Sequence, residues 1–275
     1  MKRKSSIVFI LCIKLLVALA VQSASATPTL YYLSDNCKKE LKTFEVKDPT
    51  YKLFKDDEFY MPTILKRKGT KDVQIKSAII LLHGYGGDGK DISLLTLNWK
   101  RFLKNTVFLC PNGHEKCEIN PVGFQWFDLS KDDNTYILEK SLEAENIIKK
   151  FVEQVKSQYQ LSNKNIIIGG FSQGCMMSLN VGVTSKEKFN CIIGFSGKII
   201  NINNLEKRIK NKSKILLIHG DQDEIVSSTF LLEAKDFFER NKFDIQTKLI
   251  KDCGHHIPID ASSFALSFIK KNLKS

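Results

Sequence analysis

The chain has 275 residues, 43% of them hydrophobic, and its 42 Lys and Arg against 30 Asp and Glu give a formal net charge of +12. This length suits one large α/β domain. The basic residues are scattered and aromatic residues do not alternate with them, which excludes a dedicated nucleic-acid surface. A basic surface weakly attracts anionic lipid, so we expect peripheral contact with a membrane surface at most.

The start of the chain has the pattern of an export leader. Basic residues at positions 2–4 precede an apolar stretch, Ile7–Val21, and the small-x-small pattern read by signal peptidase follows at 24–26. Lys14 interrupts the apolar stretch, which leaves it too short and too charged for an uncleaved membrane anchor. The sequence therefore predicts a signal peptide over the first 26 residues, a mature chain that begins at Thr27, and export to the periplasm or the medium.

The segment 27–75 is interpreted as an N-terminal extension packed on the same domain, which itself is expected to cover 76–275. Within the extension, the stretch at 56–65, DDEFYMPTIL, fits an edge strand with Pro62 tolerated at its margin.

Six cysteines remain after the leader, and an even number permits disulfides in an exported chain. Cys110 and Cys117 bracket a short loop and are the favoured pair, although spacing alone does not decide the pairing. Cys175 and Cys191 lie in apolar runs typical of buried thiols. No spacing matches a zinc site, so we expect neither a metal nor a cofactor.

From Lys76 onward, short apolar runs alternate with amphipathic stretches. The runs are nearly continuous, as in strands of a parallel sheet with both faces covered. The amphipathic stretches Ile137–Tyr159, Ser228–Asn241 and Ser262–Leu273 have apolar residues at helical spacing. This alternation predicts an α/β fold with a mostly parallel, doubly wound sheet and chemistry at the carboxyl ends of its strands. The expected strands are SAIILLHG (77–84), NTVFLCPNG (105–113), NIIIGG (165–170), CIIGFSG (191–197), KILLIHG (214–220) and IQTKLIKDCG (245–254).

Two of these runs end in Gly-Phe-Ser, so two serines are candidates for a nucleophile. A nucleophilic serine on a strand-to-helix elbow needs small residues two positions before and two positions after it, because the backbone segments approach closely there. Ser172 has Gly170 and Gly174 at these positions, whereas Ser196 has Lys198 on its C-terminal side. We therefore interpret Ser172 as the nucleophile and Ser196 as an ordinary turn residue.

The next two strand ends supply an acid and a base. Asp221 and Asp223 follow one strand, and His255 and His256 follow the next. A serine needs a base to remove its proton, and the base needs a third group to orient it. The chain order Ser, Asp, His at successive strand ends is that of the α/β-hydrolases.

A glycine-rich loop, LLHGYGGDGKDI (81–92), follows the first core strand. Its glycine spacing fails both phosphate-binding patterns, so nucleotide binding is excluded. Backbone N–H groups of such a loop suit an oxyanion hole, together with the N–H of Gln173, the residue after the candidate nucleophile.

Together these motifs resemble the phospholipase/carboxylesterase family of α/β-hydrolases, which includes the acyl-protein thioesterases. The resemblance runs from about Ile79 to the C-terminus. It implies an α/β-hydrolase fold and a serine hydrolase that cleaves carboxylic esters or thioesters through an acyl-enzyme. The motifs that carry it are LLHGYGGDGKD, PNG, GFQWFDL, GFSQG, HGDQDEIV and GHHIP.

The resemblance also assigns roles to residues. It makes Ser172 the nucleophile, His255 rather than His256 the base, and Asp223 rather than Asp221 the orienting acid. The oxyanion donors fall on the amides of Tyr85 and Gln173, and the acyl pocket is expected to be lined by Gln125, Trp126 and Phe127. Trp126 also suits a plain core position, and His83 suits a structural hydrogen bond under the oxyanion loop.

Export would separate the chain from lipidated cytosolic proteins. We therefore expect a small ester, thioester or lysolipid as substrate, with a monomer or a homodimer as the working form. The alternatives are a lysophospholipase at the cell envelope and a catalytically silent binding protein that keeps the fold. Turnover of a generic ester separates the silent protein from the enzymes.

Overall fold

The computed structural model describes residues 75–273, so the expected leader, the extension and its edge strand lie outside the described residues and stay predictions. The described chain forms a six-stranded sheet in the order β2-β1-β5-β6-β7-β8, with every neighbouring pair parallel. All six expected strands are confirmed. They are β1 (Ser77–Leu82), β2 (Thr106–Leu109), β5 (Ile166–Phe171), β6 (Cys191–Phe195), β7 (Lys214–Gly220) and β8 (Ile245–Ile250).

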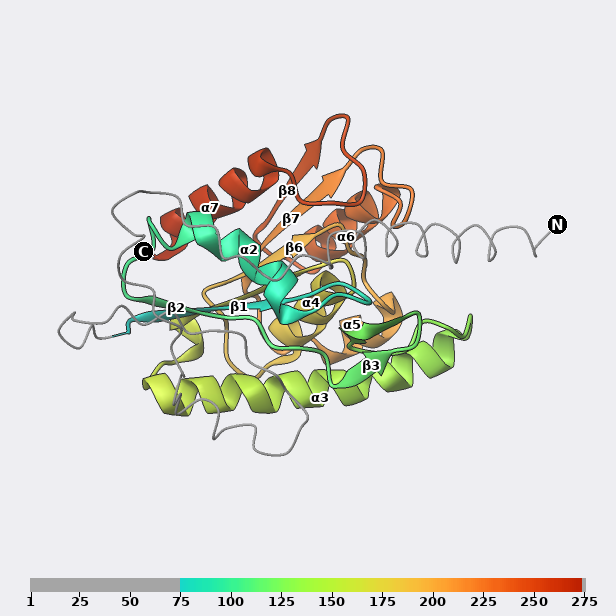
Figure 1. Cartoon of the computed structure of the whole chain (residues 1–275), viewed down its shortest axis with the longest axis horizontal. Coiled ribbons are helices and arrows are strands. Elements are labelled where there is room, and N and C mark those ends of the chain that lie inside the picture. The colour runs from blue at the N-terminus through green and yellow to red at the C-terminus, as the bar shows by residue number, and fades with distance from the viewer. Residues whose placement is uncertain (1–74, 274–275) are drawn as a thin grey trace.

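Helices cover both faces of the sheet, because the strands are apolar on both faces. In β1, Ala78, Ile80 and Leu82 belong to one core cluster, while Ile79 and Leu81 belong to the other. Helices α2 and α7 pack on one face, and α3 to α6 pack on the opposite face (Figure 1). The doubly wound fold is confirmed. The helices are α2 (Gly89–Trp99), α3 (Asn134–Tyr159), α4 (Gln173–Thr184), α5 (Ile202–Arg208), α6 (Thr229–Arg240) and α7 (Ile259–Leu273), with a short 3-10 turn at Asn163–Asn165.

The three helices expected from periodicity are confirmed as α3, α6 and α7; the C-terminal ends of α3 and α7 coincide with the expected ones, and the other ends differ by one to three residues. The start of α3 shows why a helix can begin earlier than its apolar pattern. Asp133 caps the helix, and its side-chain carboxylate accepts hydrogen bonds from the Thr135 and Tyr136 amides. The helix ends at Tyr159, and the residue after it, Gln160, adopts a left-handed conformation with φ of 54°. Capping side chains extend a helix beyond its apolar stripe, so periodicity alone places its start too late.

A small antiparallel hairpin, β3 (Glu115–Cys117) and β4 (Asn120–Gln125), was not expected from the sequence. It holds the glycine-rich loop in place, because the Gly86 amide donates to the Phe124 carbonyl and the Phe124 amide donates to the Gly87 carbonyl. At Gly123 a Cβ atom would overlap the Gly86 carbonyl, so the hairpin and the loop touch backbone to backbone.

The cysteines correct one expectation and confirm another. Cys110 and Cys117, the favoured disulfide pair, are both free and buried. Cys110 lies in the core cluster under α2 and α7, whereas the Cys117 sulfur lies beside Gly86, so the two thiols face different surroundings. Cys175 and Cys191 are buried thiols as expected, and burial raises the pKa of Cys175 to about 12. Within residues 75–273 no helix combines the length and the hydropathy needed to cross a bilayer.

Candidate active site

Ser172 occupies a tight elbow between β5 and α4. Its backbone has φ of 53° and ψ of −115°, a conformation that non-glycine residues rarely adopt. A Cβ atom on Gly170 or Gly174 would overlap the Leu82 carbonyl of the adjacent strand, which is the close approach that the glycine pattern predicted. The elbow therefore projects the Ser172 side chain from the carboxyl end of the sheet.

Three side chains from three strand ends form one hydrogen-bonded chain. The His255 Nε2 atom lies 3.0 Å from the Ser172 Oγ atom, and the His255 Nδ1 atom lies 2.7 Å from the Asp223 Oδ2 atom. Because the ionised carboxylate only accepts, Nδ1 carries the ring proton and leaves Nε2 free to accept the hydroxyl proton. The three residues expected from the sequence are thus in contact in the expected order.

The Asp223 carboxylate is held from several sides. Its Oδ1 atom accepts hydrogen bonds from the Ile225 and Val226 amides at 3.0 and 2.8 Å. Burial opposes the charged form, but hydrogen bonds from His219 and His255 outweigh it and hold the pKa of Asp223 well below its usual range. The carboxylate is therefore ionised at neutral pH.

His219 was not singled out from the sequence, although it ends β7 just before the candidate acids. Its Nε2 atom lies 2.7 Å from the Val226 carbonyl oxygen, which requires a proton on Nε2, and 3.3 Å from the Asp223 Oδ2 atom. Its ring is buried. His219 therefore ties the acid loop to the strand that carries it.

The alternative acid and the alternative base face elsewhere. The Asp221 carboxylate accepts a hydrogen bond from the Cys253 amide at 3.2 Å, which joins the two loops after β7 and β8. The His256 Nε2 atom lies 3.9 Å from the Cys253 sulfur. This geometry agrees with the choice of Asp223 over Asp221 and of His255 over its neighbour.

Ser196 shares a positive φ with Ser172 but lacks the following helix and the contact with His255. Its φ is also positive, at 50°, and its amide donates to the Ile218 carbonyl. A turn rather than a helix follows it, and its side chain is buried. A positive φ is therefore common to both Gly-Phe-Ser sequences. What distinguishes the two serines is the contact with the candidate base, because His255 lies within hydrogen-bond distance of Ser172.

The amides of Tyr85 and Gln173 are free to act as donors. Gln173 is the first residue of α4, where helical N–H groups have no partner inside the helix. Within the described residues neither amide donates to another protein group. A Cβ atom on Gly84 would lie 3.4 Å from the Ser172 Cβ atom, so the backbone segment that carries Tyr85 passes directly beside the nucleophile. Burial and the Cys117 thiol raise the pKa of the Tyr85 phenol, which stays neutral.

Residues 69–273 match the family described as Phospholipase/Carboxylesterase. The chain belongs to this family. It is 28% identical over 228 residues to acyl-protein thioesterase 1 of Kluyveromyces lactis, a match that covers 78% of this chain and all of that protein. It is 29% identical to acyl-protein thioesterase 1 of Saccharomyces cerevisiae, with 76% of this chain and 98% of that protein covered.

Among solved structures, the crystal structure of esterase PE8 is similar, with 34% identity and a TM-score of 0.70 over 73% of this chain and 95% of that chain. Arabidopsis thaliana SOBER1 shares the fold, with a TM-score of 0.61 at 23% identity over 72% of this chain and 99% of that chain. The protein is therefore a serine hydrolase of the carboxylesterase and acyl-protein thioesterase type.

In this serine hydrolase the expected acyl-pocket residues lie in the core, which corrects the sequence-based expectation. Trp126 and Phe127 are 0% exposed, and Gln125 is buried with its amide donating to Glu115 at 2.9 Å. The Trp126 indole N–H donates to the His83 carbonyl at 2.9 Å. Side chains without accessible surface cannot line a substrate pocket, so the core position considered for Trp126 is the one observed.

These core residues hold Gln173, one of the two expected oxyanion donors, in place. The Gln173 side chain accepts from the Trp126 amide at 2.9 Å and donates to the Phe127 carbonyl at 2.6 Å. These two hydrogen bonds fix Gln173 to the backbone at Trp126 and Phe127, and Trp126 in turn contacts His83 at the start of the glycine-rich loop.

His83 makes the structural hydrogen bonds expected of it. Its Nε2 atom accepts from the Gly113 amide at 2.7 Å, so its Nδ1 atom carries the proton and donates to the Gly84 carbonyl, also at 2.7 Å. Burial lowers the pKa of His83 to about 4. The His83 ring is therefore neutral in the folded protein at neutral pH.

This depressed pKa predicts a loss of stability in mild acid. Between about pH 6.5 and pH 4 the unfolded chain binds a proton at His83 and the folded chain does not, so the free energy of unfolding falls as pH falls. We expect His83 to contribute about 3 kcal/mol to this loss, as an order of magnitude. Urea unfolding of the wild type and of His83→Gln at several pH values in this window measures it. Equal pH slopes for the two proteins would contradict the prediction.

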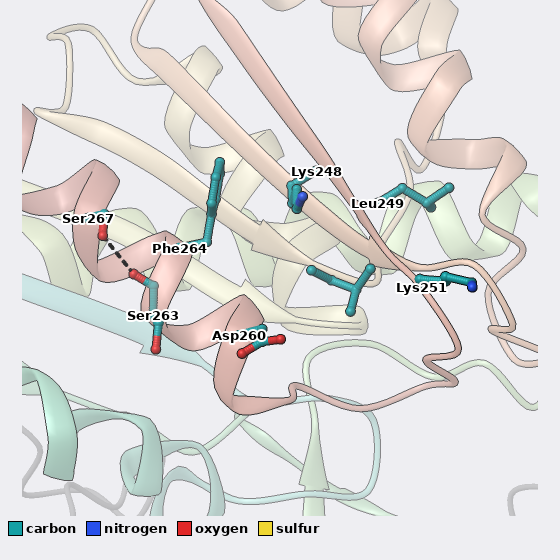
Figure 2. A pocket seen from close by; sticks show the side chains of 8 residues that line it. Lys248, Leu249, Lys251, Asp260, Ser263, Phe264 and Ser267 are labelled. Atoms are coloured by element: carbon teal, nitrogen blue, oxygen red, sulfur yellow. Dashed lines mark hydrogen bonds between the residues drawn. The ribbon is translucent and has the colours of Figure 1, made fainter.

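Two cavities lie near the carboxyl edge of the sheet. The larger, about 550 Å³, lies between β8 and α7, with Lys248 and Phe264 on its walls (Figure 2). Its lining comes from β8, the residue after β8 and α7, and the Lys248 ammonium lies 5.8 Å from the Phe264 ring centre. The smaller, about 470 Å³, is lined by Gly84, Tyr85 and Phe171 among others, and it includes His256; it thus contains the chain neighbours of Ser172 and His255 but not these two residues themselves. Proximity to Ser172 makes the smaller cavity the relevant one.

Proposed function

We propose that this serine hydrolase cleaves carboxylic esters or thioesters through an acyl-enzyme on Ser172. The observation that carries the proposal is the continuous hydrogen-bonded chain from the Ser172 Oγ atom through His255 to Asp223, with distances of 3.0 and 2.7 Å. A hydroxyl is a poor nucleophile until a positioned base takes its proton. The same chain of contacts disfavours a silent binding protein, which has no use for an oriented base.

The geometry supports a two-step mechanism. Ser172 attacks the substrate carbonyl while His255 Nε2 takes its proton, and the ionised Asp223 stabilises the imidazolium that forms. The Tyr85 and Gln173 amides donate to the oxyanion of the tetrahedral intermediate. His255 then protonates the leaving alcohol or thiol, and a water molecule, activated by the same imidazole, releases the acid from Ser172.

The substrate class follows from the relatives and from the site. Two relatives are named acyl-protein thioesterases and one similar structure is an esterase, so an acyl group on oxygen or sulfur is the shared element. We propose small esters, thioesters or lysolipids. A lysolipid is favoured as the second candidate because exposed aliphatic side chains, Leu94 and Ile259, stand at the cavity beside Ser172.

Fluorophosphonate labelling combined with ester turnover tests this proposal. We expect the purified protein to hydrolyse p-nitrophenyl butyrate, and one equivalent of fluorophosphonate to abolish turnover while modifying the peptide that contains Ser172. A parallel assay with a thioester and with lysophosphatidylcholine ranks the leaving groups. Absence of turnover on all three substrates, together with absence of an adduct, would overturn the proposal. An adduct on Ser196 would overturn the choice of nucleophile.

A further inference from the structure

His219 lies at the carboxyl end of β7, directly before the loop that carries Asp223. Strand β7 pairs in parallel with both β6 and β8, so its end is held within the sheet. At Gly220 a Cβ atom would overlap the Cys253 carbonyl, which shows that the loops after β7 and β8 meet backbone to backbone. The ring of His219 is buried, and the two-step mechanism gives it no task. A buried polar ring at this place needs an explanation.

The Nε2–H group of His219 faces two acceptors at once. It lies 2.7 Å from the Val226 carbonyl oxygen and 3.3 Å from the Asp223 Oδ2 atom. Val226 closes a ring of contacts, because its own amide donates to the Asp223 Oδ1 atom at 2.8 Å. His219 therefore contacts both ends of one short turn, the acid at its start and the carbonyl three residues later.

The donors around the Asp223 carboxylate differ in what they can fix. The Ile225 and Val226 amides belong to the same turn as the acid and move with it. The His255 ring is the group that the acid has to orient. Of these donors, His219 comes from a strand of the sheet, and it approaches Oδ2, the oxygen that accepts from His255. The direction of Oδ2 relative to the sheet is therefore set through His219.

We propose that His219 is a positioning residue for the reaction, and that it holds the Asp223 carboxylate in the direction that orients His255. The inference rests on the proposed function and adds to it a group that acts through the acid rather than on the substrate. Without the His219 donor the Val226 carbonyl loses its partner, the turn shifts, and Oδ2 moves away from His255. A displacement of about 1 Å at a reacting group costs on the order of a hundredfold in rate.

Two substitutions separate the hydrogen bond of His219 from the volume of its ring. His219→Leu fills the buried site without a donor, whereas His219→Gln places an amide N–H group close to the position of the histidine Nε2–H group. Ser213→Ala is the control for a loss of stability alone. Ser213 is buried, directly precedes β7 at the end away from the acid loop, and accepts a hydrogen bond from the Phe189 amide at 3.0 Å. Urea unfolding measures the stability of each variant.

We expect His219→Leu to lower kcat for p-nitrophenyl butyrate by about tenfold to a hundredfold, with KM within about twofold of the wild type. His219→Gln should recover most of this loss. Ser213→Ala should keep the wild-type kcat despite a lower free energy of unfolding. Equal kcat values for His219→Leu and the wild type overturn the proposal. Equal losses in His219→Leu and His219→Gln also overturn it, because the N–H donor then makes no difference.

The Asp223→Ala background shows through which residue His219 acts. In this background we expect His219→Leu to cause no further loss of kcat, because residues that act as a unit lose their effect together. A further loss by the same factor as in the wild type would overturn the proposal, since His219 would then act independently of the acid.

Proton NMR needs no turnover and keeps the two proposals separate. A histidine N–H group bonded to a carboxylate has a resonance at unusually low field, and the resonance of His255 is identified by its absence from His255→Ala. We expect this resonance in the wild type and in His219→Gln, and a shifted or exchange-broadened one in His219→Leu. An unchanged resonance in His219→Leu overturns the positioning role. A protein that shows the expected pattern but hydrolyses no ester overturns the proposed function and leaves the positioning role standing.

Discussion

Replacing Ser172 by alanine is expected to lower kcat for p-nitrophenyl butyrate by at least about three orders of magnitude. The substitution removes the atom that forms the acyl-enzyme, and His255 then has no hydroxyl to activate. The remaining rate comes from substrate binding and from the oxyanion donors. Initial rates, with circular dichroism to show that the variant is folded, measure the effect.

Ser196→Ala is the matched control, because the same dipeptide precedes both serines and both have a positive φ. We expect its turnover to stay within a few-fold of the wild type, since the His255 ring is in hydrogen-bond contact with Ser172. Similar losses in the two variants would mean that the elbow, rather than the hydroxyl, is what the reaction needs.

His255→Ala is expected to be nearly inactive, with a loss of kcat comparable to that of Ser172→Ala, because residues that act as a unit lose their effect together. The variant leaves the Ser172 hydroxyl without a proton acceptor and removes the hydrogen bond from His255 Nδ1 to the Asp223 carboxylate. Steady-state kinetics with p-nitrophenyl butyrate measure the loss, and the double variant with Ser172→Ala should be no slower than either single variant.

His256→Ala separates the two adjacent histidines. Its Nε2 atom lies 3.9 Å from the Cys253 sulfur, and the residue lines the cavity that also contains Tyr85 and Phe171, so we expect a moderate change, chiefly in KM. An inactive His256→Ala beside an active His255→Ala would reverse the assignment of the base. Equal and large losses would show that the loop after β8 tolerates no change at either position.

Much of the fold was predictable because the sheet is buried on both faces. Strands such as Ile166–Phe171 and Lys214–Gly220 are nearly continuous apolar runs, and few other structures produce that pattern. Ser172 was predictable for a related reason, whereas the choice of Asp223 and His255 came from the order of the strand ends and from the family resemblance. Glycines at 170 and 174 are required by backbone contact, and such a requirement appears in the sequence itself.

The hairpin was not predictable, because its strands are short and polar and include Pro121, which argues against a strand. The direction of a side chain was also beyond the sequence. Trp126 and Phe127 follow a strand end near the site, where an aromatic side chain serves equally well in a pocket or in the core. The core position is the one adopted, because the Gln173 side chain makes hydrogen bonds to the backbone of Trp126 and Phe127 and holds this segment against the core. The favoured disulfide was wrong because closeness in sequence says nothing of which way two thiols point.

The position of β8 makes hydrolysis depend on one edge of the sheet. Within the described sheet β8 pairs only with β7, and the segment that follows it carries His255, 83 residues away from the serine that it serves. Edge elements with few partners open locally at a lower free energy than central strands do. In rising denaturant the ester-cleaving activity should therefore vanish before the central strands separate, and during synthesis a chain that ends before β8 holds a serine with no base. Activity in this protein thus reports the integrity of one edge, and its loss is an early sign of unfolding rather than a late one.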